Sequence, residues 1–226
     1  MVLAGRAIDS DQGNDSNDET SFSVSDTGAS FTPEPKPLAG VSAVHLVYFN
    51  CASQSVPMHQ VYTMAVERGR RKEVQEILAA IVPGLNSIDI LTEGDAPIVY
   101  LSYDDYAVPV AMAGDGIQSL LRLVLELAVC PNGVVLLEEP EVHQHPSALA
   151  QSARAIHAAV RRGIQVILAT HSLDLTDALL SEVDTPQDLD NMSVYHLLLR
   201  DGCLTYSRLN GSEVAFARGT IRDDLR

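Results

Sequence analysis

Two apolar runs, residues 134–139 (VVLLEE) and 165–170 (QVILAT), flank a stretch of helical spacing that begins at Ser147. Neither run alternates between apolar and polar residues, which is typical of strands covered on both faces in a parallel sheet. The helix between them is long enough for the crossover that parallel strands require. The pattern therefore predicts a parallel β-α-β unit, and with it an α/β fold.

The remaining elements are predicted from periodicity and turn residues. A further helix over 117–129 carries apolar residues on one face. A hairpin turns at Asp201-Gly202 near the end of the chain. We also expect strands over 42–50, 87–91 and 97–105, and helices over 58–67 and 71–82, the latter stopped by Pro83-Gly84.

The composition is typical of one folded domain and limits the kinds of partner that it can bind. The chain has 226 residues, of which 46% are hydrophobic and 20% charged, with a formal net charge of -15. This charge argues against nonspecific capture of nucleic acid or of an anionic membrane. Nucleic acid would have to bind through a partner or a local basic patch.

The N-terminal stretch differs in composition from the rest. Residues 1–40 are mostly polar, so we expect a largely disordered segment there and a folded domain over 41–226. The sequence contains no signal-peptide core and no apolar window long enough to cross a bilayer. Cys51, Cys130 and Cys203 suggest neither a disulfide framework nor a zinc site. We therefore expect a cytoplasmic protein.

Polar side chains follow both apolar strands at their carboxyl ends. Glu138 and Glu139 end the first strand, and Thr170, His171 and Ser172 end the second. Because parallel strands end at the same edge of a sheet, Glu139 and His171 should be neighbours. One carboxylate can hold Mg²⁺, a second can orient a water for attack on a phosphoryl group, and the histidine can contact the terminal phosphate.

A glycine-rich turn precedes the helix predicted over 117–129. Gly114, Asp115 and Gly116 lie where free N–H groups and the helix dipole favour a phosphate, and glycine permits close approach of the backbone. The same residues also suit an ordinary turn with a helix cap.

Simpler interpretations remain open for the other polar residues. The acids could be surface carboxylates at a strand end. Glu141, His143 and His145 could bind a metal, or the two histidines could brace the loop and an interface. His171 alone would be an ordinary polar residue at a strand end. The remaining histidines are expected at the core edge or the surface: His45, His59, His157 and His196.

Three segments together resemble a known family. GVVLLEEPEVHQHP (133–146) is similar to the Walker B segment of ABC-type AAA ATPases related to the OLD family, ILATHSLDL (167–175) to their switch-histidine segment, and GDGIQSLLRL (114–123) to their signature helix. The resemblance covers residues 40–226. It implies that Glu138 is the Walker B acid, in place of the commoner Asp, that Glu139 is the catalytic base, and that His171 is the switch histidine. Gly114 to Gly116 would reach the nucleotide of an opposing subunit.

One element of that family is missing from the sequence. The phosphate loop GxxxxGK[ST] needs a Gly-Lys pair, and the two lysines of this sequence, Lys36 and Lys72, follow Pro35 and Arg71. Its loss should remove most of the ground-state affinity for ATP. We therefore interpret the chain as a C-terminal piece, a natural truncation or split gene, or a degenerate member kept for dimerisation. The Toprim nuclease of OLD proteins is also missing.

The sequence thus predicts a P-loop NTPase-like α/β fold of the ABC/OLD type, represented by its C-terminal lobe. The resemblance implies ATP hydrolysis with ATP and Mg²⁺ as cofactors, in a homodimer or with a partner that carries Walker A. The alternative is a noncatalytic module that dimerises or senses a partner's nucleotide without turnover.

Overall fold

The computed structural model describes most of the chain from Val56 onward and four short strands before it. The described residues are 2–4, 23–25, 28–30, 44–48, 56–130, 133–183, 185–200 and 203–221. The expected disordered segment over 1–40 therefore lies largely outside the described residues.

A six-stranded sheet forms the centre of the fold, in the order β11-β10-β1-β9-β8-β4. The strands β4 (Val44–Tyr48), β8 (Val134–Glu138) and β9 (Gln165–Ala169) run parallel. β1 (Val2–Ala4) pairs antiparallel with β9 and with β10 (Ser193–Arg200), and β10 forms a hairpin with β11 (Cys203–Asn210). The predicted parallel β-α-β unit and the C-terminal hairpin are therefore confirmed.

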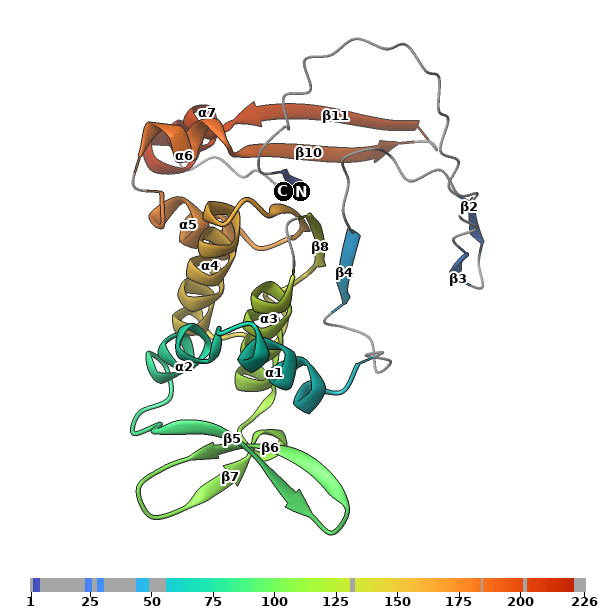
Figure 1. The fold of residues 1–226 in the computed structure, drawn as a ribbon. Coiled ribbons are helices and arrows are strands. Elements are labelled where there is room, and N and C mark those ends of the chain that lie inside the picture. Colours follow the sequence, from blue (N-terminus) through green and yellow to red (C-terminus); the bar gives the residue numbers. More distant parts are fainter. Residues whose placement is uncertain are drawn as a thin grey trace.

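Seven α-helices, a three-stranded sheet and a two-stranded sheet complete the described part of the chain. Helices α1 to α5 lie between the β10-β11 hairpin at one end and a three-stranded sheet at the other (Figure 1). That sheet contains β5 (Ser87–Glu93), β6 (Ala96–Ser102) and β7 (Ala107–Pro109), and β2 (Ser23–Ser25) pairs with β3 (Gly28–Ser30). The helices are α1 (Met58–Glu67), α2 (Arg71–Ala79), α3 (Asp115–Val129), α4 (Pro146–Arg161), α5 (Leu173–Ser181), α6 (Pro186–Asp190) and α7 (Gly211–Phe216), with the short helices η1 (Val110–Met112) and η2 (Ala217–Ile221).

Several element boundaries differ from the predicted ones for local reasons. Helix α3 begins at Asp115 instead of residue 117, because Gly114 adopts φ 90° and the helix starts directly after it. Strand β8 ends at Glu138 rather than 139, since Glu139 adopts φ 45° and leaves the extended conformation. Helix α2 ends at Ala79, three residues before the predicted end.

The central strands are buried on one face and only partly covered on the other. Val135 and Leu137 on β8, and Val166 and Leu168 on β9, are at most 3% exposed. Helices α4 and α5 lie on this face, because Ile156, Val160 and Leu179 line a cavity together with Val166 and Leu168. Val134, Leu136 and Ile167 point to the other face and are half-buried. The second face of these strands is therefore covered less completely than the first.

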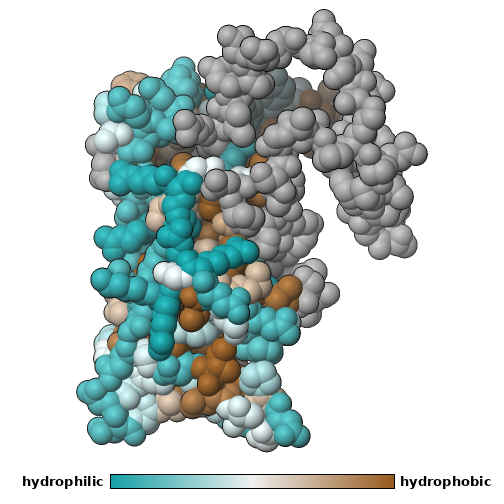
Figure 2. Space-filling view, viewed as in Figure 1, coloured by the Kyte–Doolittle hydropathy of each residue, from teal (hydrophilic) through white to brown (hydrophobic). Residues whose placement is uncertain are grey.

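Exposed apolar side chains also occur at the far end of the molecule. Figure 2 shows hydrophobic residues gathered at the lower end of the visible face, over the three-stranded sheet. Ile90 and Leu91 on β5 are 37% and 43% exposed, and Met112 is 78% exposed. No helix in the described part of the chain is long and apolar enough to cross a membrane.

Helix α3 is the most deeply buried element and contains an ion pair. All residues from Leu120 to Val129 are buried, and the helix packs against α1, α2 and α4. Arg122 pairs with Glu126 one turn later, with side chains 7% and 6% exposed, and also donates to the carbonyl oxygen of Val56 at 2.6 Å. Losing one partner of such a pair leaves a buried charge without its counterion.

We therefore expect Arg122→Met to lower the free energy of unfolding by about 3–5 kcal/mol, and the double variant Arg122→Met/Glu126→Leu to lose less. The matched control is Lys72→Met, since Lys72 and Glu76 form an exposed pair at the same helical spacing. Its loss should cost about 0.5 kcal/mol or less. Urea unfolding measures all three, and equal effects of Arg122→Met and Lys72→Met would contradict the buried-charge account.

Candidate functional site

The carboxyl ends of β8 and β9 lie side by side at one edge of the sheet. Glu138 pairs with Ala169 in the parallel register. The next residue continues this contact, because the N–H of Glu139 donates to the carbonyl oxygen of Ala169 at 2.9 Å. The polar residues that follow the two strands therefore start from neighbouring backbone positions.

Glu139 and His171 lie close together at this edge. The Nε2 atom of His171 is 3.9 Å from Oε1 of Glu139, and the two side chains are 84% and 36% exposed. The prediction that these residues are neighbours is confirmed. Glu139 adopts the left-handed φ of 45°, which is costly for a residue with a Cβ and is concentrated at functional sites. Because β8 ends at Glu138, the alternation of side chains along a strand does not determine where the side chain of Glu139 points.

Glu141 joins the two loops behind this pair. Its Oε1 atom accepts hydrogen bonds from the Thr170 hydroxyl and, at 3.3 Å, from the backbone N–H of His171. Thr170 is 2% exposed, and its hydroxyl also accepts from the N–H of Ser172 at 2.9 Å. The other carboxylate oxygen, Oε2, is buried with no hydrogen-bond partner among the described residues. Glu141 thus ties the loop after β8 to the backbone of His171.

The loop between β8 and α4 (residues 139–145) is held by its own polar groups. The Gln144 amide donates to the carbonyl oxygen of Pro140 at 2.7 Å and accepts from the buried Ser152 hydroxyl at 2.6 Å. His145 caps α4, because its Nδ1 accepts from the N–H of Ser147 at 3.3 Å. In the described residues no group of three His, Cys, Asp or Glu side chains is arranged for a metal. The cap of α4 agrees with the bracing interpretation of His145.

The turn at Gly114 packs against the same loop. Gly114 adopts φ 90° and is exposed, as is Asp115, the first residue of α3. A Cβ atom added at Gly116 would lie 2.8 Å from the carbonyl oxygen of His143. Glycine at this position is therefore required by the close approach of α3 to the loop. Sequence analysis predicted that Gly116 contacts a phosphate, and it gave no sign of this packing role.

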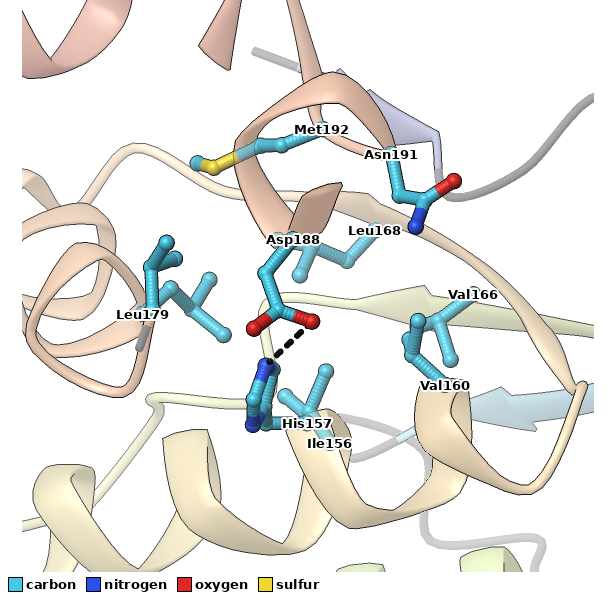
Figure 3. Close-up of a pocket in the computed structure, with 10 residues that line it drawn as sticks. Ile156, His157, Val160, Val166, Leu168, Leu179, Asp188, Asn191 and Met192 are labelled. Carbon is cyan, nitrogen blue, oxygen red and sulfur yellow. Dashed lines mark ion pairs between the residues drawn. The ribbon is translucent and has the colours of Figure 1, made fainter. Parts of the chain in front are cut away.

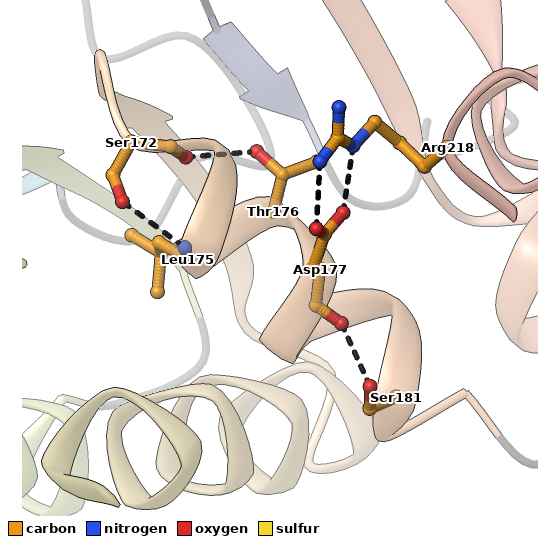
Figure 4. A network of polar contacts seen from close by, with 6 residues as sticks. All are labelled: Ser172, Leu175, Thr176, Asp177, Ser181 and Arg218. Carbon is orange, nitrogen blue, oxygen red and sulfur yellow. Dashed lines mark hydrogen bonds and ion pairs between the residues drawn. The ribbon is translucent and has the colours of Figure 1, made fainter. Parts of the chain in front are cut away.

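The start of α5 fixes the backbone that follows His171. Ser172 caps the helix by accepting from the N–H of Leu175 at 3.1 Å, and Thr176 donates back to the carbonyl oxygen of Ser172 (Figure 4). Asp177 follows Thr176 on α5, and both of its carboxylate oxygens accept hydrogen bonds from Arg218 at 2.7 Å. This pair links the histidine-bearing segment to η2, and the sequence carried no signal for it.

A separate cavity of about 80 Å³ lies under the helix-covered face of β9, away from the strand ends. Apolar residues of α4, α5 and β9 line it, and Nε2 of His157 lies 3.6 Å from Oδ1 of Asp188 at its edge (Figure 3). A hydrogen bond from Thr185, with Arg161 and His157 nearby, lowers the pKa of Asp188. No predicted site residue lines this cavity, so it is not part of the candidate site.

Comparison with known protein families shows which family the chain belongs to. Residues 43–176, more than half of the chain, match the family described as the AAA ATPase domain. The chain belongs to this AAA ATPase family. The matched region contains Glu138, Glu139, Glu141 and His171, together with the glycine turn before α3.

The AAA ATPase domain is also similar to individual known proteins. An uncharacterized protein of Methanocaldococcus jannaschii, MJECL11, is 32% identical over 115 residues, which is 50% of this chain and 98% of the relative. A structure described in work on ATP-driven dimerization and DNA-stimulated activation of SMC ATPases has a TM-score of 0.50 at 15% identity, over 74% of this chain and 98% of that one. The SMC head domain of Thermotoga maritima has a TM-score of 0.45 at 12% identity, over 73% and 53%. The match with a TM-score of 0.50 shows that the AAA ATPase domain has a P-loop NTPase-like α/β fold, as predicted.

The contact at Gly116 gives a test of how the site is assembled. Gly116→Ala places a methyl group against the carbonyl oxygen of His143, so α3 or the loop must shift, and we expect a loss of about 1–3 kcal/mol in the free energy of unfolding. Hydrogen exchange over residues 139–145 should become faster. The control is Gly219→Ala, where an added Cβ meets nothing within 4 Å. If both variants behave alike, α3 does not support the loop.

Proposed function

We propose that this chain supplies the catalytic half of an ATP-hydrolysing site and that a partner supplies the phosphate loop. The observation that carries the proposal is the 3.9 Å approach of His171 to Glu139 at the carboxyl edge of the parallel strands. Ligand sites of open α/β sheets lie at this edge. Membership of the AAA ATPase family gives the reaction class.

The residues present fit one part of Mg·ATP and not the other. Carboxylate oxygens are ligands that Mg²⁺ accepts, and Glu138 is exposed at the end of β8. Phosphates need backbone N–H groups and a lysine in a glycine-rich loop, and the sequence contains no Gly-Lys pair. The residues of this sequence can therefore hold the metal side of the nucleotide, while its phosphate side requires a phosphate loop that the given sequence does not contain.

Each site residue has a distinct role in this proposal. Bound Mg·ATP would supply the phosphoryl group that is attacked and part of the charge neutralisation. Glu139 accepts the proton of the attacking water, Glu138 holds Mg²⁺ as the acid of a Walker B segment, and His171 donates to the terminal phosphate. Glu141 keeps the backbone of His171 in place through Thr170.

The turn at Gly114 would serve the other subunit of a dimer. Gly114 and Asp115 are exposed at the start of a fifteen-residue helix, where N–H groups without intrahelical partners favour an anion. Gly116, in contact with the loop after β8, would keep this turn in register with the acid pair. The proposal includes a head-to-tail arrangement of the two subunits. It also includes the relationship to the OLD family and a single domain over residues 41–226.

A noncatalytic function is the second candidate, and the missing Gly-Lys pair favours it. In that case the same surfaces would dimerise or sense a partner's nucleotide without turnover. The two candidates differ in whether the acid pair matters for turnover in a complex that contains a phosphate loop.

We therefore expect Glu139→Gln to lower single-turnover hydrolysis by about 10²-fold or more in the presence of a Walker A-bearing partner, because the amide cannot accept the proton of water. Nucleotide binding by the complex should persist. Glu138→Gln should instead raise the Mg²⁺ concentration that hydrolysis requires. The control is Glu76→Gln on α2, which is exposed and paired only at the surface, and which should change turnover less than about twofold. Unchanged turnover in Glu139→Gln would assign the strand end a structural role.

A further inference from the structure

The cavity between β9 and helices α4, α5 and α6 has an apolar interior. Its inner wall is fully buried, since Ile156, Val166 and Leu168 are at most 3% exposed. Its outer wall is half-buried, which leaves a way in from solvent, and consists of Val160, Leu179, Val183 and Met192. The cavity measures about 80 Å³. An apolar group fits this interior better than water does, because water there would lack hydrogen-bond partners.

His157 and Asp188 form a polar rim of this cavity and keep unused hydrogen-bonding capacity (Figure 3). Nε2 of His157 is buried with no hydrogen-bond partner among the described residues. It lies 3.6 Å from Oδ1 of Asp188, which is too far for a hydrogen bond. The two side chains are only 16% and 17% exposed. Because buried polar groups normally have a partner, a ligand atom between these two would satisfy both.

The chemistry of the rim selects a group that donates one hydrogen bond and accepts another. Oδ2 of Asp188 already accepts from the Thr185 hydroxyl at 2.8 Å and from Arg161 at 3.3 Å. The hydrogen bond from Thr185, with Arg161 nearby, lowers the pKa of Asp188, so its Oδ1 atom is a charged acceptor at neutral pH. A hydroxyl can donate to this Oδ1 and accept from an Nε2–H of His157 at the same time. An ammonium group would instead have to lose its water beside a carboxylate that Arg161 already neutralises.

We propose that this cavity binds a small branched alcohol. Its alkyl group would lie against Leu168, Leu179 and Met192, and its hydroxyl between the two polar side chains of the rim. The alkyl group is limited to about four or five carbons, because benzene occupies an engineered apolar cavity of about 150 Å³. Met192 has a flexible side chain that can adapt to the shape of the ligand. Binding needs neither ATP nor a phosphate loop, so this inference does not depend on the proposed function.

The place of the cavity in the fold connects it to the loop that carries His171. Val166 and Leu168 belong to β9, and Leu179 belongs to α5. Residues 170–172 join the end of β9 directly to the start of α5. A ligand that contacts both elements would restrain the loop between them. Hydrogen exchange over residues 170–175 should therefore slow when the alcohol is bound.

The test titrates isobutanol into the whole chain and follows the methyl signals of its Ile, Leu, Val and Met residues by NMR. We expect saturable shifts confined to the cavity residues, with a dissociation constant in the millimolar range because so few ligand atoms make contact. Val160→Phe fills the cavity and should weaken binding at least about tenfold. The control is Val66→Phe on α1, because Val66 is 39% exposed and lies outside the cavity, and this variant should bind like the wild type.

A second ligand tests the polar rim on the wild-type chain and covers the case in which Val160→Phe does not fold. Isobutyl chloride has the same branched alkyl group and no hydroxyl. A purely apolar cavity would bind the chloride more tightly, because a hydroxyl costs more to remove from water. This cavity should bind the alcohol at least as tightly as the chloride, and Asp188→Leu should shift the ratio of the two dissociation constants towards the chloride at least about tenfold. No saturable shift, shifts confined to other segments, tighter binding of the chloride by the wild type, or an unchanged ratio in Asp188→Leu would overturn the proposal.

Discussion

The parallel pairing of β8 with β9 is the constraint on which the rest of the site depends. Its register sets Glu138 opposite Ala169 and lets the N–H of Glu139 extend the hydrogen bonding by one residue. From there the backbone turns at Glu139, so that its carboxylate lies 3.9 Å from His171. Glu141 then stabilises the histidine loop from behind, through Thr170 and the N–H of His171. A shift of one residue in this register would separate all of these groups.

The sequence predicted the elements of this site better than its connections. Polar residues after two apolar strands were enough to predict that Glu139 and His171 are neighbours. The left-handed backbone of Glu139 and the link from Glu141 to Thr170 depend on contacts between distant segments, which periodicity does not report. The pair between Asp177 and Arg218 joins residues 41 positions apart and could not be read from either segment. Gly116 was predicted as part of a phosphate-binding turn, and the structure shows a separate packing requirement for glycine there, set by the carbonyl oxygen of His143.

The unequal burial of the two faces of β8 and β9 carries information of its own. The apolar runs at β8 and β9 are those of a sheet covered on both faces, yet Val134, Leu136 and Ile167 are only half-buried in the described structure. The missing phosphate loop and the weaker burial of this sheet face are independent observations, one from residue types and one from burial.

If this account is right, the acids and the histidine of the isolated chain cannot hold ATP without a phosphate loop. Calorimetric titration of Mg·ATP into the purified chain measures this directly. The account predicts no saturable binding at low-micromolar nucleotide, because neither a Gly-Lys pair nor its cradle of backbone N–H groups is present in the sequence. A low-micromolar dissociation constant for the chain alone would contradict it.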